Sequence, residues 1–348
     1  MLLYSWIGFL WAIGLSFVSS LECSPYKLFS GSGNRQLAEG VAESLEIPLG
    51  KALIGKFNDG EIRIEIQENI RNCDIYILQS ISVSSQATVN DNLIELFLMV
   101  RAMKRASAKS VTVIIPYYGY GRQDRKMSGR APISASDVAM MLELAGAARV
   151  MSIDLHCGQI QGFFHNVPVD NLVASQVFIP YIAKEMLQDL VIVSPDSGGV
   201  ERAKSFIEGL ESLGVNSRLA IIVKQRMDAG VVDSMNLVGN VAGSDVVIVD
   251  DICDTAGTLV KAAQELKKQG ARRVYACVTH PLFSGPALDR IELSPIDKLL
   301  VSDTVSLRRE IPPNVQQLSI APLLAKAIQR VWNGQSLKEM SLYRIEEQ

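Results

Sequence analysis

The chain has 348 residues, which is enough for two domains that each bury a hydrophobic core. The formal net charge is −3, whereas nucleic-acid-binding domains are typically basic, so we expect no nucleic acid among the partners of the protein. The five cysteines are scattered without a CxxC pair or a metal-ligand spacing. We therefore expect reduced thiols and a cytoplasmic protein.

Residues 1–24 form a hydrophobic leader, because 1–20 is apolar and aromatic and no Lys or Arg precedes Lys27. Its length is at the lower edge of a membrane span, but a signal peptide normally carries a positive n-region. Two interpretations stay open: a targeting or anchoring segment, or an upstream extension of the start site. The leader lies outside the fold in both, and a membrane is expected as a partner only if it is a real anchor.

Beyond the leader, apolar runs alternate with amphipathic stretches, which is the pattern of α/β domains with mostly parallel sheets. Buried strands are expected at 75–78, 111–115, 150–153, 191–193, 219–223, 246–249 and 274–278. Helices are expected at 92–105, 136–145 and 259–269. The order of these elements predicts an α/β fold without a linker of low complexity.

A short internal repeat predicts two copies of one domain. Gly146-Ala-Ala-Arg-Val150 resembles Gly270-Ala-Arg-Arg-Val274, and in both copies a histidine, His156 or His280, follows the glycine by ten residues. Each glycine also ends an expected helix, as a C′ glycine should. Chance similarity of two helix–strand junctions is the alternative.

The segment 246–258 is the most informative part of the chain. Branched apolar residues lead into Asp250 and Asp251, and a small-residue turn then opens a helix. Backbone N–H groups and the helix dipole at such a turn point toward an anion, and Gly257 lets the backbone come close. The two carboxylates can accept hydrogen bonds from ribose hydroxyls. An ordinary capped helix would not need the acidic pair, so we expect a sugar-phosphate site.

Further motifs extend this pattern over most of the chain. They are Leu28-Phe-Ser-Gly-Ser-Gly33, Lys56-Phe-Asn-Asp-Gly-Glu61, Tyr120-Gly-Arg-Gln-Asp-Arg125, Arg130-Ala-Pro-Ile-Ser134, Asp154-Leu-His-Cys-Gly-Gln-Ile-Gln-Gly-Phe-Phe164 and Ser194-Pro-Asp-Ser-Gly-Gly199. Together with 250–258 they resemble the ribose-phosphate diphosphokinase family of the phosphate-activated class, from about Lys27 to Leu342.

The resemblance implies two tandem domains of type I phosphoribosyltransferase fold, related by a pseudo-twofold. We expect them at 25–170 and 171–348, with the C-terminal helix packing back on the first domain. The implied reaction transfers a diphosphoryl group from ATP to the C1 hydroxyl of ribose 5-phosphate, and AMP leaves. The chain has no GxxxxGK[ST] phosphate loop, so the nucleotide must be held in another way.

The resemblance also implies residue roles. Lys224 and Arg226, after strand 219–223, are the catalytic cations of a flexible loop. The implied ATP residues are Phe57, Asp59, Gly60, Glu61, Arg122 and Gln123. The implied ribose 5-phosphate residues are Arg226, Asp250, Asp251, Asp254, Thr255, Ala256, Gly257 and Thr258. The stretch 57–61 would serve a neighbouring subunit, and Asn58-Asp-Gly60 within it is also a strong hairpin signal.

Magnesium is the implied cofactor. Its expected ligands are His156 and Asp196, with Asp154 and Asp170 as further candidates. Mg²⁺ prefers oxygen ligands and keeps several waters, so a histidine ligand is unusual. Inorganic phosphate is a possible activator, and the implied partners are ATP, ribose 5-phosphate and further copies of the chain in a homohexamer of dimers.

Two departures from the family pattern stand out. His165-Asn166 occupies the place of an expected aspartate, with one residue extra, and the segment 81–90 is a few residues longer than usual. Two alternatives to an active synthetase also stay open. A non-catalytic regulatory paralogue should have lost the Lys-x-Arg or the Asp-Asp loop, and the chain keeps both. A phosphoribosyltransferase that consumes phosphoribosyl diphosphate needs only one copy of the fold.

Overall fold

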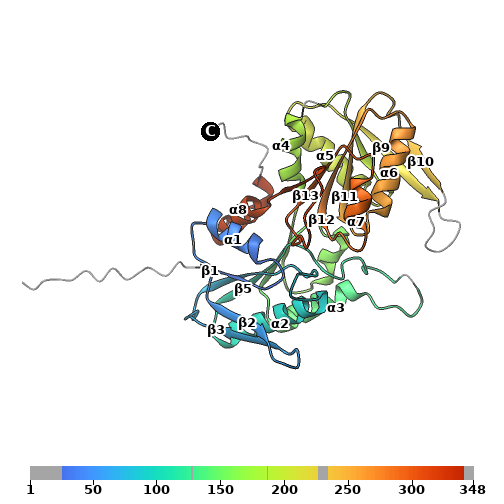
Figure 1. Cartoon of the computed structure of the whole chain (residues 1–348). Helices are drawn as coiled ribbons and strands as arrows, with labels where there is room; N and C mark the ends of the chain where they lie inside the picture. The colour runs from blue at the N-terminus through green and yellow to red at the C-terminus, as the bar shows by residue number, and fades with distance from the viewer. Residues whose placement is uncertain (1–25, 127, 186, 226–233, 341–348) are drawn as a thin grey trace, which may run out of the picture.

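The computed structural model describes residues 26–126, 128–185, 187–225 and 234–340. The leader 1–24 and Arg226 lie outside these residues. Figure 1 shows two α/β domains, the N-terminal one below the C-terminal one. Over the described ranges, no helix has the length and apolar character that crossing a bilayer requires.

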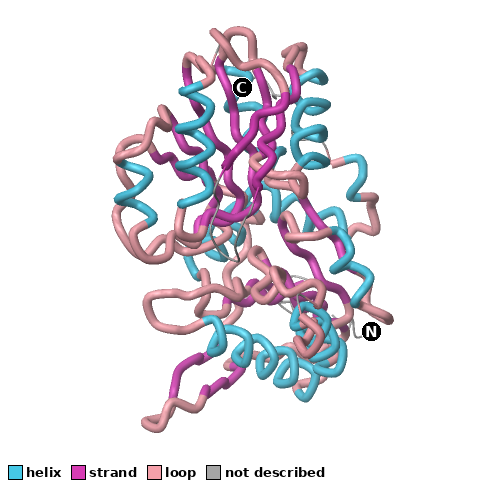
Figure 2. The backbone as a smooth tube through the Cα atoms, turned by 90° about the vertical axis from the view of Figure 1, so that its right-hand side faces the viewer, coloured by secondary structure: helices cyan, strands magenta, loops and turns pink. Residues whose placement is uncertain are grey.

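The first domain is built on a five-stranded parallel sheet in the order β1-β4-β5-β6-β7. Its strands are β1 (Tyr26–Ser30), β4 (Asp74–Leu78), β5 (Ser110–Ile115), β6 (Arg149–Ile153) and β7 (Val169–Leu172). Its helices are α1 (Arg35–Ser44), α2 (Val89–Arg105), α3 (Ser134–Ala145) and the 3₁₀ helix η1 (Gly158–Phe163). The branched apolar strands are buried because helices cover the sheet. A separate antiparallel hairpin, β2 (Ala52–Lys56) with β3 (Ile62–Ile66), projects from this domain (Figure 2).

The second domain has a seven-stranded sheet in the order β10-β9-β8-β11-β12-β13-β14, in which only the β9–β10 pair is antiparallel. Its strands are β8 (Val191–Ser194), β9 (Arg218–Gln225), β10 (Ser234–Val238), β11 (Asp245–Cys253), β12 (Arg273–Pro281), β13 (Lys298–Ser302) and β14 (Val315–Leu318). Its helices are α4 (Ser175–Lys184), α5 (Val200–Ser212), α6 (Gly257–Lys268), α7 (Ala287–Glu292), α8 (Ala321–Trp332) and the 3₁₀ helix η2 (Leu337–Glu339).

The expected strands and helices are all present, and the α/β prediction with mostly parallel sheets is confirmed. One boundary differs in a way that matters. The strand expected to end at 249 continues to Cys253, so Asp250 and Asp251 belong to β11 itself. Lys224 likewise lies within β9, paired with Met235 of β10, and not in a loop after the strand.

The two domains share the same order of strands, as the internal repeat predicts, but the repeated motif aligns strands that do not correspond. The order β1-β4-β5-β6-β7 corresponds to β8-β11-β12-β13-β14, so β6 matches β13. The sequence similarity had paired β6 with β12, one strand too early. A positive-φ glycine at the helix end followed by an apolar strand recurs after α3, α5 and α6, and a short motif therefore does not distinguish these junctions.

The two domains share one apolar cluster. It includes Leu37 and Val41 of α1, Phe206 of α5, and Leu324 and Ile328 of α8. The helix α8 packs against α1, as Figure 1 shows on the left of the molecule. The first sheet ends with β7 and the second begins with β8; a domain boundary after residue 170 stays a prediction.

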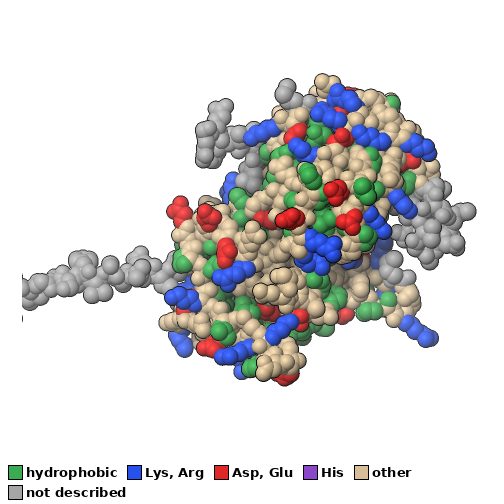
Figure 3. Space-filling model, viewed as in Figure 1, with side chains coloured by type: hydrophobic (Ala, Val, Ile, Leu, Met, Phe, Trp, Pro, Cys, Tyr) green, Lys and Arg blue, Asp and Glu red, His purple; other side chains and the backbone are tan. Residues whose placement is uncertain are grey.

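On the face seen in Figure 3, Lys and Arg side chains are interspersed with Asp and Glu. That face carries no continuous basic stripe of the kind that follows a nucleic-acid backbone.

Candidate functional site

The carboxyl ends of the two parallel sheets face each other, and the candidate site lies between them. His156, beyond the end of β6, has its Nδ1 2.6 Å from Oδ2 of Asp251 on β11. Nη1 of Arg122 in the first domain donates to Oδ2 of Asp254 in the second over 2.8 Å. Ligand sites of open α/β sheets form at this edge. The structure thus brings candidate ATP, metal and ribose residues to one place.

The acidic pair is compensated by neighbouring charges, with Asp251 buried and Asp250 half-buried. Burial and the neighbouring charge of Asp251 raise the pKa of Asp250. Burial acts in the same direction on Asp251, but its bond to His156 and the charge of Arg202 outweigh it and hold the pKa of Asp251 well below its usual range. The backbone N–H of Asp251 donates to Oδ1 of Asp250 over 3.0 Å. The two carboxylates therefore carry different average charge.

Arg202 of α5 is a site residue that the sequence analysis missed. Its Nη1 lies 3.6 Å from Oδ1 of Asp251 and 3.9 Å from Oδ1 of Asp250. Against the effect of its burial, the charges of Asp251, Asp154, Asp250 and Asp196 raise the pKa of the guanidinium. The sequence did contain an indication of this role, because a cation in the first turn of a helix interacts unfavourably with the helix dipole. Such a residue needs a compensating partner, and here the partners are the site carboxylates.

The ribose loop leaves space for an anion. Ala256 has φ +61° and begins α6, whose first turn has no side-chain cap. A Cβ on Gly257 would meet no described protein atom closer than 3.7 Å, so the protein itself gives no steric reason for glycine here. Nη1 of Arg290 donates to the carbonyl of Thr255 over 3.0 Å and supports the turn. Uncapped N–H groups beside open space fit a phosphate.

The first domain lacks such an open loop. The N–H of Ser32 donates to Oε1 of Glu95 over 2.6 Å, and that of Gly33 to Oε1 of Gln79 over 2.8 Å. Asn34 caps α1, and Thr88 forms a capping box at the start of α2. Between β4 and α2, the first-domain counterpart of the turn before α6, the Thr88 side chain thus caps the helix start that is left open in the second domain.

The candidate ATP residues divide into two groups. Arg122 and Gln123 line a cavity of about 340 Å³ with aromatic and apolar walls that include Tyr117. The predicted hairpin turn is confirmed: Gly60 has φ +97°, its N–H donates to the carbonyl of Phe57 over 2.9 Å, and the N–H of Glu61 donates to Oδ1 of Asp59. Phe57 is 52% exposed. No described hydrogen bond or ion pair links this turn to Arg122.

The candidate metal ligands also separate. Oδ1 of Asp196 accepts the N–H groups of Gly198 and Gly199 over 3.0 and 3.1 Å at the start of α5, close to Arg202. Asp170 lies elsewhere, because it pairs with Arg149 at the opposite end of β6 from His156. Asp170 is therefore not brought to the site.

His156 itself can hold a cation. Its bond to Asp251 raises its pKa and burial opposes this effect. With Nδ1 on a carboxylate, Nε2 is the nitrogen left for a ligand, as in other carboxylate–histidine–metal arrangements. Among the described residues no group of three or more His, Cys, Asp or Glu forms a complete metal site. That fits Mg²⁺, which takes few protein ligands besides substrate phosphates and water.

Comparison with known proteins agrees with this geometry. The model of the N-terminal domain of ribose phosphate pyrophosphokinase matches residues 26–146, and that of the phosphoribosyl synthetase-associated domain matches 217–344. Ribose-phosphate pyrophosphokinase of Ralstonia nicotianae is 50% identical over 319 residues, 91% of this chain and 97% of the relative. That of Bacillus caldolyticus is 46% identical over 312 residues, 89% and 96% of the two chains.

A crystal structure of phosphoribosylpyrophosphate synthetase from Mycobacterium smegmatis superposes with a TM-score of 0.81 at 38% identity, covering 89% of this chain and 99% of that one. The fold and the site define a two-domain enzyme that acts on sugar phosphates. The chain belongs to the ribose-phosphate pyrophosphokinase family.

Proposed function

We propose that the protein is an active synthetase that converts ATP and ribose 5-phosphate to AMP and phosphoribosyl diphosphate. The C1 hydroxyl oxygen attacks the β-phosphorus, the bond from the α-phosphate to the β-phosphorus breaks, and AMP leaves. The observation that carries this proposal is the compensated acidic pair beside the uncapped start of α6, opposite His156 and Arg122 of the other domain. This arrangement supports one sugar phosphate and one nucleotide side by side.

On the ribose side, Asp250 and Asp251 accept hydrogen bonds from ribose hydroxyls, and the turn Asp254–Thr258 holds the 5-phosphate. Oδ2 of Asp254 accepts a hydrogen bond from Arg122. Binding of the two substrates then exchanges this ion pair for contacts with phosphate and ribose. The exchange costs little because both side chains are partly exposed, at 50% and 31%.

On the ATP side, Arg122 and Gln123 bind the nucleotide, and His156 and Asp196 would hold Mg²⁺ together with the phosphates. Bound there, the ion would supply positive charge beside the phosphates. Lys224, with Arg226, supplies the cations for the charge that grows on phosphate oxygens. The turn Phe57–Glu61 completes the site of a neighbouring subunit in a homohexamer of dimers, and inorganic phosphate activates the assembly.

The four described cysteines form no disulfide, which supports a reducing compartment and a cytoplasmic enzyme. A regulatory paralogue would bind an active synthetase without turnover. One assay separates these readings: AMP formation from ATP, measured with and without ribose 5-phosphate, on the full chain and on a chain starting at Pro25. The proposal requires AMP only when ribose 5-phosphate is present. No AMP from either chain in the presence of Mg²⁺ and phosphate would refute it.

A further inference from the structure

The turn that carries His156 is held in an unfavourable backbone conformation. Asp154, the first residue after β6, has φ +40°, in the left-handed region that residues other than glycine rarely adopt. Such a conformation persists only where the surrounding contacts determine it. The contacts of Asp154 therefore fix the direction in which the chain leaves β6 toward His156.

Two of these contacts come from the second domain. Oγ1 of Thr279 donates to Oδ2 of Asp154 over 2.6 Å, and Nε2 of His280 donates to the carbonyl of Asp154 over 3.2 Å. The same Oδ2 also accepts the N–H of Ala174, in the connection between β7 and α4, over 3.1 Å. Asp154 is 8% exposed, and Thr279 and His280 are 2% exposed each. Oδ2 of Asp154 thus accepts its hydrogen bonds within a buried contact between the domains.

His280 is itself fixed by this junction. Because a carbonyl oxygen only accepts, Nε2 carries the proton of the bond to Asp154, and Nδ1 lies within hydrogen-bond distance of Oγ1 of Thr304, at 2.9 Å. Oγ of Ser80, in the first domain, donates to the carbonyl of Thr304 over 2.5 Å. Side chains of each domain therefore donate hydrogen bonds to the other domain, and the buried polar groups of the junction find their partners in the protein itself.

The strand pairing of the second sheet places two residues that bond to the first domain side by side. β11 and β12 are parallel neighbours, and their pairing places Asp251 beside Thr279. Thr279 holds Asp154, while Asp251 holds His156 two residues further along the first-domain chain. Two neighbouring residues at one edge of the second sheet, Asp251 and Thr279, thus hold two residues of this turn.

We propose that Thr279 and Asp154 are positioning residues, which set His156 against Asp251 and so couple the docking of the two domains to the geometry of the site. Thr279 acts through the Asp154 carboxylate, and Asp154 acts through the backbone that it shares with His156. This role does not require Asp154 to bind magnesium. The kinetic part of the inference rests on the proposed function, which AMP formation by the unaltered protein tests separately.

Two substitutions at one position test the inference. Thr279→Val removes the hydroxyl and keeps the shape, whereas Thr279→Ser keeps the hydroxyl. We expect Thr279→Val to lower kcat by about 10- to 100-fold, the scale on which a displaced catalytic group acts. Thr279→Ser should recover most of this loss. Equal kcat in both variants and in the unaltered protein would overturn the inference.

A second readout does not depend on turnover. The chain has three histidines, so spectra of the protein with ¹³C-labelled histidine can resolve His156, assigned as the signal that His156→Asn removes. Thr279→Val should move the His156 signal toward that of an exposed imidazole, and Thr279→Ser should not. A lower Tm with an unmoved His156 signal would mean a structural role alone and overturn the inference. If Thr279→Val does not fold, Thr279→Ala removes the same hydroxyl without added bulk and must displace the same signal.

Discussion

At the scale of single residues, the site depends on charge compensation in a small volume. Two adjacent carboxylates on one strand would repel each other if both were ionised and unpaired. Here Asp251 contacts His156 from one domain and Arg202 from the other, while Asp250 contacts Arg202 and the backbone. Arg202 is thus the residue on which the acidic pair depends most within its own domain.

Replacement of Arg202 tests this dependence. In Arg202→Gln the pair loses its nearest cation, so the carboxylates bind the ribose hydroxyls less well and the KM for ribose 5-phosphate rises by about tenfold, or ~1.4 kcal/mol. The KM for ATP should change little. Lys204→Gln is a matched control, because Lys204 is an exposed cation on the same helix. An equal rise of both KM values would contradict an assignment of Arg202 to the ribose side.

The proposed ribose residues have their own test. Asp250→Asn and Thr258→Val should impair binding of ribose 5-phosphate while ATP affinity stays largely intact, because Asp250 on β11 and Thr258 in the first turn of α6 flank the same turn of the second domain. Calorimetric titration with each ligand measures this directly. If ATP affinity is lost and ribose 5-phosphate affinity is kept, the two ligands have been assigned to the wrong domains.

Lys224 is proposed to act mainly in the transition state. Lys224→Ala should therefore lower kcat by about 10²–10³-fold, the usual loss for one charge-stabilising group, with a much smaller change in the KM for ATP. Steady-state kinetics with both substrates varied gives both quantities. Lys261→Ala, on the α6 surface, is the control for loss of a lysine elsewhere. A kcat near that of the unaltered protein would remove Lys224 from the mechanism.

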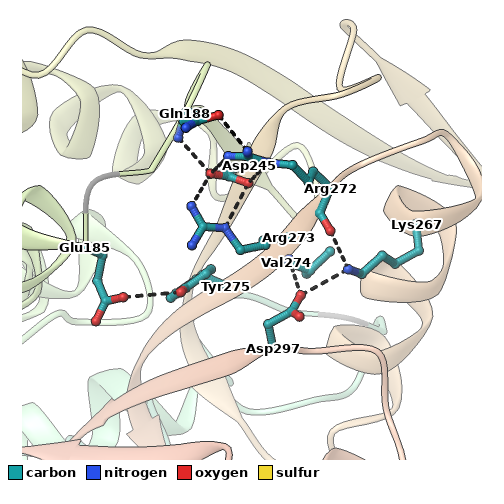
Figure 4. A network of polar contacts seen from close by, with 9 residues as sticks. All are labelled: Glu185, Gln188, Asp245, Lys267, Arg272, Arg273, Val274, Tyr275 and Asp297. Atoms are coloured by element: carbon teal, nitrogen blue, oxygen red, sulfur yellow. Dashed lines mark hydrogen bonds and ion pairs between the residues drawn. The ribbon is translucent and has the colours of Figure 1, made fainter.

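At the scale of elements, the amino ends of the central strands of the second sheet are tied by one buried carboxylate. Asp245, the first residue of β11, is 0% exposed and accepts hydrogen bonds from Arg272, Arg273 and the N–H of Gln188 (Figure 4). Next to it, Asp297 accepts from Lys267 and from the N–H of Val274. These bonds fix β11 against β12 at the edge opposite the site.

Asp245→Asn should lower the free energy of unfolding by about 2–3 kcal/mol, because it removes the buried charge and leaves two guanidinium groups without it. Burial alone would raise the pKa of Asp245, but the two arginines hold it below its usual range. A carboxylate whose pKa is lower in the folded than in the unfolded protein stabilises the fold above the unfolded pKa of about 3.9. This stabilisation is lost as the pH falls below that value. The difference between the two proteins should therefore shrink as the pH falls from about 5 toward 2.

Urea titrations at several pH values measure this difference. Asp189→Asn is a suitable comparison, since Asp189 pairs with Arg218 at the surface and its side chain is 59% exposed. Asp189→Asn should lower the free energy of unfolding by less than Asp245→Asn does. A difference for Asp245→Asn that does not vary with pH would show that the carboxylate charge is not what stabilises this end of the sheet.

At the scale of the whole molecule, the proposed ATP residues lie in two separate places. The hairpin tip Phe57–Glu61 is exposed, the β2–β3 hairpin projects from the first domain (Figure 2), and no described hydrogen bond links the tip to Arg122. A hairpin that projects in this way can reach a second copy of the chain. This is the structural support for a site shared between subunits.

A mixing experiment tests shared sites. Inactive Phe57→Ala chains are combined with inactive Lys224→Ala chains under conditions that allow subunit exchange. Some mixed sites then receive an intact turn from one chain and an intact Lys224 from the other, so that activity partly returns. Exchange is verified with chains of distinct mass. Full exchange without recovery of activity would mean that each chain builds its own site.

The sequence by itself determined what contiguous residues encode. The run from β11 through Asp254 to α6 shows a strand, a turn and a helix start in one segment, and the hairpin turn at Gly60 between β2 and β3 is equally local. Backbone hydrogen bonds and allowed φ angles act over a few residues, so their pattern is legible locally. The acidic pair, the phosphate turn and the α/β class could therefore be predicted.

Tertiary structure alone decided which distant side chains meet. His156 and Asp251 are 95 residues apart, and Thr279 and Asp154 are 125 apart, and neither pairing has a local signature. Arg202 was missed, and Asp170 was included, for the same reason: a charged residue after a motif shows its chemistry but not its partner. Partners are fixed only when two separately folded sheets dock, because the docking buries the groups and burial requires that each charge and donor be satisfied.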